Sequence, residues 1–449
     1  MKAKIITTEL REEKPVSLAQ ELLFVREATN QEIQVINLYP EVTYQEIAGF
    51  GGAVTDSVAA VLEQLEEAEQ KKVLEAYFGP DSIGYRFVRT PIDSCDFSRG
   101  QYCAYNPKME GYLDEKALEQ GAGAVLSVIH RIMEIAGEGL QVMLTPWSPP
   151  VSFKTNGNRA GGGRLKKESY QEWAEYICSY IKAYRKQGIP VTMLSVQNEP
   201  NAVQTWDSCL FDAAEEKEFL KEALYPALQK NGLEDIELFI WDHNKERVYE
   251  RARDTIDETT DHMINGVAFH WYSGDHFEGL NLIRERYPDK KLMFSEGCIE
   301  YSRYDADNQL LNAQLYAHDM IGNFNAGTNI FIDWNLILDQ NGGPNYSDNL
   351  CEAPMMCQAE GDGFCKRLSY YYLEHFSRYI KPGAKRIAHT KYSSELDTLS
   401  VLNPEGDIAV VICNREKEDK TFYLRFRGEI AACTIPAAAI ATICIPCRG

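Results

Sequence analysis

Residues 191–200 read VTMLSVQNEP. The run is mostly apolar and rich in β-prone side chains, which is typical of a buried strand. It ends in the polar tripeptide Asn198-Glu199-Pro200. Proline has no amide hydrogen for a strand ladder, so we expect Pro200 to turn the chain into a loop. The stretch therefore predicts a buried strand that presents the carboxylate of Glu199 at its carboxyl end.

The same kind of β-prone run recurs along the chain, separated by longer segments with helical periodicity. Eight such runs lie at residues 46–56, 85–92, 141–148, 191–200, 236–244, 266–273, 291–298 and 327–335. Helical periodicity marks residues 58–78, 116–136, 169–187, 213–230, 306–322 and 367–380. This alternation predicts a (β/α)8 barrel. An open doubly wound sheet is the competing fold, but the turn 49-GFGGAVTD-56 lacks the expected GxGxxG spacing.

Both ends of the chain fall outside this alternation. Strand-like runs occupy residues 21–25 and 32–38 near the amino end, and 398–403, 408–414 and 421–428 near the carboxyl end. Neither group has enough strands for a stable core of its own, so we expect the two to join in one small all-β domain. The predicted domains are therefore residues 1–45 and 381–449, which share a β-sandwich, and residues 46–380, which form the barrel.

Composition narrows the classes of partner. The 449-residue chain has a net charge of −21 and a pI near 4.9, which argues against nucleic acid or an anionic membrane surface. The first residues lack a secretory signal, and no apolar run is long enough to span a membrane. The 12 scattered cysteines suit a reducing cytoplasm, which is the expected location. Cys444 and Cys447 have CxxC spacing, but there is no second pair to complete a metal site.

The carboxyl ends of barrel strands carry function, and two of these ends present glutamates. Glu199 follows the fourth run, and Glu296 ends the apolar stretch 292-LMFSEG-297 in the seventh. Tryptophans end several other runs, while metal-ligand spacing and a phosphate loop are missing from the sequence. Paired carboxylates protonate and attack a glycosidic bond, and flat rings stack on sugars. A single glutamate before proline could be a solvated turn, but two glutamates, on the fourth and seventh of eight strands, favour glycoside cleavage.

Seven motifs in order now show a resemblance to a known family. They are 49-GFGGAVTD-56, 89-RTPIDSCDFS-98, 145-TPWSPPVSFKTNG-157, 196-VQNEP-200, 269-FHWY-272, 295-SEGC-298 and 333-DWNLILDQNGGPN-345. With these motifs the chain resembles glycoside hydrolase family 30, the retaining barrel glycosidases that include the glucosylceramidases. The resemblance spans nearly the whole chain, and it implies the same barrel with a companion β-sandwich built from both termini.

The resemblance also implies roles for individual residues. Glu199 would be the acid/base, Glu296 the nucleophile, and Arg89 and Tyr272 would position the carboxylate of Glu296. The pocket for the terminal sugar would be lined by Asp96, Trp147, Asn198, Trp334 and Asn349. Arg89 could instead form a plain barrel ion pair, the two tryptophans could be core residues, and Asn349 could be an ordinary loop residue.

Other residues near the strand ends receive structural interpretations. We expect Asp56 to cap the first helix, and His270 to support the site by hydrogen bonding. We interpret Cys95 and Cys298 as small packing residues. The sequence departs from the glucosylceramidases at Ser152, where those enzymes carry a second tryptophan, and in the shorter loop 201-NAVQTWDSC-209, where Trp206 is expected to replace an aromatic wall. Both departures lie towards the leaving group, which argues against a ceramide-like lipid.

The expected function is an exo-acting, retaining β-glycosidase that releases a terminal sugar, preferably glucose, without a cofactor or metal. A β-xylosidase, a β-fucosidase and a 1,6-β-glucanase of the same family are close alternatives. A non-catalytic carbohydrate-binding barrel is the alternative from another class, although it would usually lack one of the glutamates. Long loops at residues 97–116, 152–165 and 336–364 predict a pocket that is closed at one end.

Overall fold

The computed structural model describes residues 1–28, 30–358 and 363–446. Cys447 of the CxxC pair and residues 359–362 of the last long loop lie outside the described residues. The chain forms two compact units, and the predicted domain boundaries stay a prediction. One unit comprises Phe50–Arg303 and Ile330–Cys365, and the other comprises Met1–Gly49, Tyr304–Asn329 and Lys366–Gly449.

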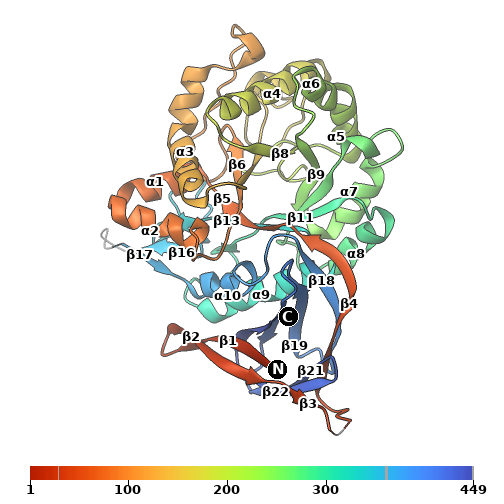
Figure 1. The fold of residues 1–449 in the computed structure, drawn as a ribbon. Helices are drawn as coiled ribbons and strands as arrows, with labels where there is room; N and C mark the ends of the chain where they lie inside the picture. The colour runs from red at the N-terminus through yellow and green to blue at the C-terminus, as the bar shows by residue number, and fades with distance from the viewer. Residues whose placement is uncertain (29, 359–362, 447–449) are drawn as a thin grey trace. The chain divides into compact units, whose positions relative to one another are not determined.

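The first unit is built on a closed barrel of parallel strands in the order β10-β11-β13-β5-β6-β7-β8-β9 (Figure 1). Each of the eight predicted runs contains one of its strands, so the predicted barrel is confirmed. The strands are β5 (Gly49–Ala53), β6 (Phe87–Ile92), β7 (Gln141–Pro146), β8 (Val191–Ser195), β9 (Glu237–Asn244), β10 (Gly266–His270), β11 (Lys291–Glu296) and β13 (Ile330–Asn335). Gly51 is needed where β5 passes β6, because a Cβ there would lie 2.1 Å from the carbonyl oxygen of Phe87.

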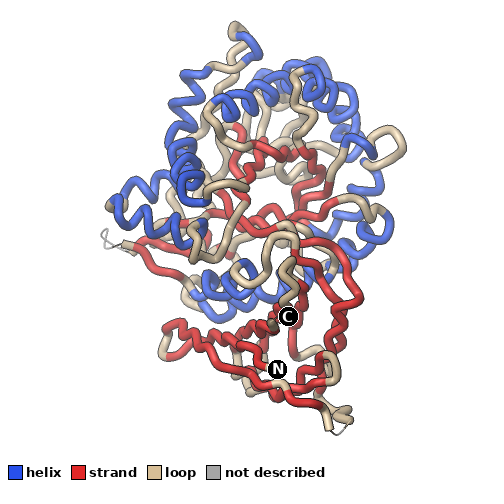
Figure 2. The backbone as a smooth tube through the Cα atoms, viewed as in Figure 1, coloured by secondary structure: helices blue, strands red, loops and turns tan. Residues whose placement is uncertain are grey.

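Helices surround these strands, as the ring of blue segments around red ones in Figure 2 shows. They are α1 (Asp56–Gln64), α2 (Glu67–Phe78), α3 (Glu115–Ala136), α4 (Tyr170–Lys186), α5 (Ala213–Phe219), α6 (Tyr225–Lys230), α7 (Val248–Thr255) and α8 (Phe277–Arg286). The single helix predicted over 58–78 is two helices, because Leu65 adopts an extended conformation with ψ of 150° and turns into the core. In the part of the chain that the structure describes, no helix has the length and apolarity to cross a membrane.

The helix predicted over 213–230 is interrupted by a π turn at Leu220–Leu224. Pro226 explains the interruption, because it has no amide hydrogen and its ring clashes with the carbonyl group four residues earlier. That carbonyl belongs to Glu222, and it accepts a hydrogen bond of 2.8 Å from the side-chain amide of Gln171 on α4. A neighbouring helix thus satisfies the backbone group that the proline leaves unpaired.

Short strands lie in the barrel unit beyond the barrel itself. β12 (Ile299–Glu300) pairs with β15 (Cys351–Glu352), and β14 (Ile337–Leu338) lies in a small sheet with β16 (Met355–Cys357) and β17 (Phe364–Lys366). These pairs fix the loops that follow β11 and β13. The loops therefore present their side chains at the carboxyl ends of the strands from defined positions.

The second unit contains a ten-stranded sheet made from both ends of the chain, as predicted. Its order is β2-β1-β23-β20-β19-β18-β4-β21-β22-β3, so β1 pairs with β23, and β4 lies between β18 and β21. The strands enclose one apolar core, which includes Ile36, Ile387 and Val410. The strands are β1 (Lys2–Arg11), β2 (Lys14–Leu23), β3 (Val25–Arg26), β4 (Val35–Ile47), β18 (Ala384–Thr390), β19 (Leu396–Leu402), β20 (Ile408–Asn414), β21 (Lys420–Phe426), β22 (Glu429–Ile435) and β23 (Ala439–Ile445).

Two helices belong to the same unit, α9 (Gln309–Asn325) and α10 (Leu368–Ser377). His375 of α10 is buried and lies between two strands from opposite ends of the chain. Its Nδ1 is 2.8 Å from Thr442 Oγ1 on β23, and its Nε2 is 2.8 Å from Thr8 Oγ1 on β1. A neutral imidazole has one donor and one acceptor, so two hydroxyl groups satisfy it without a charge. Burial lowers the pKa of His375 to about 3.

This buried histidine predicts a loss of stability in acid. Below its ordinary pKa of 6.5 the unfolded chain binds a proton that folded His375 does not, so the free energy of unfolding falls as the pH falls towards 3. The free energy of unfolding can be measured with urea at pH 6.5 and at pH 5. Between these two pH values it should fall by about 2 kcal/mol more in the wild type than in His375→Gln. Glutamine keeps a hydrogen-bond donor and an acceptor. The wild type and the variant have the same other titrating groups, so the contributions of those groups cancel in the comparison. Equal losses in the two proteins would contradict a neutral His375.

Candidate active site

The chain around Glu199 leaves the regular strand earlier than the sequence predicts. β8 ends at Ser195, so Pro200 follows a segment that has already left the ladder and does not itself end the strand. The amide of Glu199 donates a hydrogen bond of 3.0 Å to the carbonyl oxygen of Asp242 on β9. Glu199 also has a left-handed φ of 44°, which is uncommon for a residue other than glycine. This bond and this turn orient the Glu199 carboxylate into a cavity at the barrel mouth.

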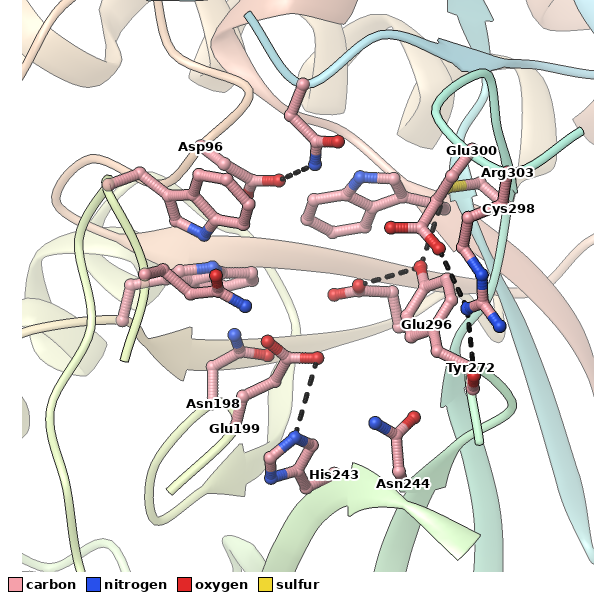
Figure 3. A pocket seen from close by; sticks show the side chains of 15 residues that line it. Asp96, Asn198, Glu199, His243, Asn244, Tyr272, Glu296, Cys298, Glu300 and Arg303 are labelled. Carbon is pink, nitrogen blue, oxygen red and sulfur yellow. Dashed lines mark hydrogen bonds and ion pairs between the residues drawn. The ribbon is translucent and has the colours of Figure 1, made fainter. Parts of the chain in front are cut away.

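Glu296 is the last residue of β11, as predicted, and both of its carboxylate oxygens are held. Arg89 Nη1 donates to Oε2 at 2.6 Å, and the Tyr272 hydroxyl donates to Oε1 at 3.0 Å. One oxygen of Glu296, one oxygen of Glu199 and one nitrogen of His270 lie within 4.8 Å of one another. Figure 3 shows the carboxylates of Glu199 and Glu296 in the same pocket. The structure therefore brings the two predicted glutamates together.

Arg89 of β6 forms the buried cationic centre of the site. It is fully buried and contacts Asp242 Oδ2 at 3.0 Å and Asn198 Oδ1 at 2.7 Å, in addition to Glu296. Although burial disfavours the charge of Arg89, Asp242 and Glu296 raise its pKa. Its guanidinium carbon also lies 4.7 Å from the ring centroid of Trp147. Arg89 is thus more than a plain barrel ion pair, because it orders Glu296 and Asn198 at once.

His270 of β10 lies behind the glutamates and links them to Asp242. Its Nδ1 is 3.3 Å from Glu199 Oε1, and its Nε2 is 3.1 Å from Asp242 Oδ1. Burial works against a charge on His270, but the carboxylates of Glu296, Asp242 and Glu199 raise its pKa to about 9. His270 is therefore cationic at neutral pH and donates through both nitrogens. Asp242, for which the sequence predicts no role, anchors both Arg89 and His270.

The substrate-binding residues predicted from the sequence share one cavity of about 410 Å³. A cavity of this size is in the range of small-ligand pockets. Trp147 and Trp334 are both buried and stack on each other, with ring centroids 5.6 Å apart and an interplanar angle of 25°, so they form one continuous aromatic wall. The cavity lining includes Asp96, Trp147, Asn198, Trp206, Trp334 and Asn349, together with Glu199, Tyr272 and Glu296.

The closed end of this cavity is the one lined by the buried side chains of Asp96, Trp147 and Trp334, and a bonded pair of polar side chains lies there. Asn349 Nδ2 donates to Asp96 Oδ2 at 3.1 Å, so the loop after β13 meets the loop after β6. Burial raises the pKa of Asp96 to about 8, and repulsion from Glu296 adds to this effect. Asp96 is thus able to donate as well as accept hydrogen bonds near neutral pH. The roles of these residues in binding stay predictions.

The pKa directions at the two glutamates differ. Burial raises the pKa of Glu296, against the pull of His270 and Arg89. Burial also opposes the charge of Glu199, but His243 and His270 outweigh it and lower its pKa to about 2. Part of this effect needs a proton on His243, whose own pKa is lowered by burial, so at neutral pH His270 is the imidazolium that faces Glu199. In the free enzyme the proton therefore lies on His270, and Glu199 is ionised.

The predicted helix cap needs correction. The cap of α1 is Thr55, whose side chain accepts a hydrogen bond from the amide of Val58, and not Asp56. Asp56 is the first residue of the helix and pairs with Arg99, whose Nη2 lies 2.8 Å from Asp56 Oδ1. Both Thr55 and Asp56 are cap-forming residue types, so the sequence alone does not separate them.

Cys298 is buried in the apolar cluster around Trp147 and Trp334, in agreement with a packing role, and it also lines the cavity. Its sulfur lies 3.5 Å from the Tyr272 hydroxyl, which holds Glu296. Burial raises the pKa of the Cys298 thiol well above its ordinary value, so it stays protonated beside the carboxylates. Cys95 is fully buried in the apolar cluster around Trp147 and Trp334, in agreement with a packing role.

A metal ion fits this site poorly. Among the residues that the structure describes, Glu199, His270 and Glu296 form a group with metal-ligand spacing. Arg89 already contacts Glu296, and both ring nitrogens of His270 face carboxylates. A divalent cation would lie beside a guanidinium and an imidazolium, where like charges repel. The expected absence of a metal cofactor stays a prediction.

A parallel barrel with two carboxylates and an aromatic wall at its carboxyl face defines a glycoside hydrolase site. The family profile of the glycosyl hydrolase family 30 TIM-barrel domain matches residues 47–380. The profile of the β-sandwich domain of that family matches residues 383–443. The chain belongs to glycosyl hydrolase family 30.

Comparisons with individual proteins agree with this membership. The chain is 30% identical over 402 residues to lysosomal acid glucosylceramidase of Mus musculus, which covers 86% of this chain and 78% of that protein. It is 24% identical over 423 residues to an endo-1,6-beta-D-glucanase of Neurospora crassa, with 88% and 86% covered. The crystal structure of SrfJ from Salmonella typhimurium matches with a TM-score of 0.95 and 36% identity over 100% of both chains.

Proposed function

We propose that the protein is an exo-acting, retaining β-glycosidase that releases terminal glucose from β-glucosides by double displacement. Glu199 is the acid/base and Glu296 is the nucleophile. The observation that carries this proposal is the approach of the two carboxyl groups, whose nearest described oxygens lie within 4.8 Å. Retaining enzymes hold these groups about 5–5.5 Å apart, whereas inverting enzymes need about 6.5–9.5 Å for a water molecule.

The first displacement forms a covalent intermediate. A carboxylate oxygen of Glu296 attacks the anomeric carbon as the bond from that carbon to the glycosidic oxygen breaks. Glu199 gives its proton to the departing oxygen, so the leaving group departs as a neutral alcohol. Arg89 and Tyr272 each hold one oxygen of Glu296, which favours a fixed direction of attack.

The second displacement reverses these roles. Glu199, now a carboxylate, takes a proton from water, and the water oxygen attacks the anomeric carbon as the bond to Glu296 breaks. Two inversions at the same carbon give a product with the original β configuration. His270 supports both steps, because it is within 3.3 Å of Glu199 and can hold the proton that Glu199 needs for the next cycle.

The hydrogen bonds of the two glutamates, and not the directions of their pKa shifts, support Glu199 as the acid/base and Glu296 as the nucleophile. Both oxygens of Glu296 accept hydrogen bonds from Arg89 and Tyr272, which suits an ionised nucleophile. Glu199 contacts the imidazolium of His270, with which it exchanges a proton. A substrate oxygen beside Glu199 would replace water and favour its protonated form. Because burial raises the pKa of Glu296, its ionised form needs stabilisation during the reaction. The positive charge that develops on the sugar in the transition state stabilises this carboxylate.

The lining of the cavity supports the exo mode, and the resemblance to the glucosylceramidases supports glucose as the sugar. The buried Trp147 and Trp334 wall and the Asp96–Asn349 contact close one end, which suits the end of a chain. A 1,6-β-glucanase is the second candidate, favoured by the Neurospora crassa relative. β-Xyloside and β-fucoside activities stay open. We also propose a cytoplasmic location, which the free thiols of the described cysteines support.

One experiment tests retention and exo action together. A β-linked glucose oligosaccharide is incubated with the enzyme, and the first products are followed by proton NMR and chromatography. Glucose in the β configuration should be released from the first turnover, because the closed end accepts only a terminal unit. Early α-glucose would contradict double displacement. Early oligosaccharides of intermediate length would replace the exo proposal with the glucanase alternative.

A further inference from the structure

The two ends of the catalytic cavity differ in burial and in charge. Asp96, Trp147 and Trp334 at the closed end have 6%, 1% and 2% of their surface exposed. The side chains of Glu300 and Arg303, which line the same cavity, are 24% and 47% exposed. Figure 3 shows Asp96 and the Glu300–Arg303 pair on opposite sides of Glu296. On the proposed function, the sugar that is cleaved off occupies the closed end, and the leaving group extends towards Glu300 and Arg303.

Glu300 and Arg303 are held in place by the fold. Glu300 belongs to β12, where it pairs with Cys351 of β15. The amide of Arg303 donates to the carbonyl oxygen of Glu300 at 3.0 Å, which closes a turn between them. Arg303 Nη1 donates to Glu300 Oε2 at 3.2 Å and to the carbonyl oxygen of Tyr272 at 2.8 Å. The pair is thus attached to the same tyrosine that holds Glu296.

A third polar group at the mouth lacks a partner. Asn244, the last residue of β9, lines the cavity. Its Oδ1 is buried and accepts no hydrogen bond within the described structure. A buried acceptor without a donor costs free energy, so such groups usually await a ligand or water. The oxygen itself is covered, so a substrate hydroxyl group reaches it only after the Asn244 side chain turns towards the cavity.

These three side chains offer a carboxylate, a guanidinium and an amide around one opening. Hydroxyl groups both donate and accept, so a sugar satisfies all three at once. An alkyl chain would cover the same groups without giving them hydrogen bonds. We propose that Glu300, Arg303 and Asn244 form the subsite for the leaving group, and that this subsite selects a second sugar over an alkyl or ceramide chain. This inference rests on the proposed glycosidase function and names its leaving group.

The test compares three substrates of the sugar whose nitrophenyl β-glycoside the wild type hydrolyses fastest. They are that nitrophenyl glycoside, a mixture of the β-linked disaccharides of that sugar, and its octyl β-glycoside. The wild type should prefer the disaccharides over the octyl glycoside by roughly tenfold or more in kcat/KM. The double variant Glu300→Gln/Arg303→Met should lower the ratio of disaccharide to octyl activity by about 10- to 100-fold. Asn244→Ala should also lower the ratio of disaccharide to octyl activity.

The outcomes separate the two proposals. An indirect disturbance of Tyr272 and Glu296 would lower all three activities alike, so an unchanged ratio in the double variant overturns the subsite. Failure of the wild type to hydrolyse any nitrophenyl β-glycoside overturns the proposed function instead. Lys186→Leu is the matched control, because it removes an exposed ion pair with Glu115 (2.8 Å) on the outer helices. It should leave all three activities unchanged.

Discussion

Replacing Glu296 with alanine is expected to abolish turnover of every β-glycoside, with kcat lowered roughly 10⁴-fold or more. The reason is that no covalent intermediate can form without this carboxylate, whatever the leaving group. Alanine also leaves Arg89 with Asp242 as its remaining carboxylate, so Glu296→Gln is measured beside it to keep the volume of the side chain. Rates with nitrophenyl and alkyl glycosides should fall by similar factors.

A chemical rescue makes this prediction specific. In the alanine variant, added azide can occupy the space of the lost carboxylate and attack the anomeric carbon from the same side. The expected product is an α-glycosyl azide, formed by a single inversion. Glu237→Ala is the control: Glu237 begins β9 and pairs with Lys291 at 2.6 Å, away from the cavity lining. Substantial turnover by Glu296→Ala without azide would contradict the nucleophile assignment.

The barrel and its two glutamates could be predicted because parallel strands are buried on both sides. Such strands read as continuous apolar runs, and their carboxyl ends meet on one face. The stretch that ends in Glu296 shows this directly, since β11 also ends at that residue. The same reasoning placed Glu199 on the right face, although β8 ends at Ser195 and an irregular segment completes the path.

Asp242 could not be recognised in the same way. Its partner Arg89 lies 153 residues away, so their contact has no local signal. Trp241 and Asp242 have positive φ values of 73° and 53°, which break the regular alternation of side chains in β9. The sequence therefore does not indicate that Asp242 points towards Arg89 and His270.

On the leaving-group side of the cavity, the sequence indicates Trp206 but not Glu300 and Arg303. Glu300 and Arg303 lie in a loop, where charged residues are usually just solvated. Their position depends on the pairing of β12 with β15, two short strands that are far apart in the sequence. A sequence pattern of period two cannot be detected over two residues. A pocket with one closed end, by contrast, could be predicted from the long loops after the strands, and its sugar-binding residues from the motifs of the family that the chain resembles.

Replacing Glu199 with alanine is expected to have an effect that depends on the leaving group. For disaccharides and alkyl glycosides, kcat/KM should fall roughly 10²- to 10⁴-fold, because these leaving groups need a proton. For dinitrophenyl glycosides the first step needs little protonation, so kcat/KM should fall by less than about tenfold. The second step lacks its base, so the covalent intermediate should accumulate and give a burst of dinitrophenolate. Equal losses on all substrates would contradict the acid/base role.

Azide distinguishes the two glutamates by the configuration of the product. In Glu199→Ala the sugar is bound to Glu296 through its α face, so azide attacks from the β face, where the missing carboxylate leaves room. The product should be a β-glycosyl azide, opposite to the α-azide expected from Glu296→Ala. Azide needs no base, so it should also restore turnover of dinitrophenyl glycosides. An α-azide from Glu199→Ala would exchange the two roles, and Glu296 would then be the acid/base.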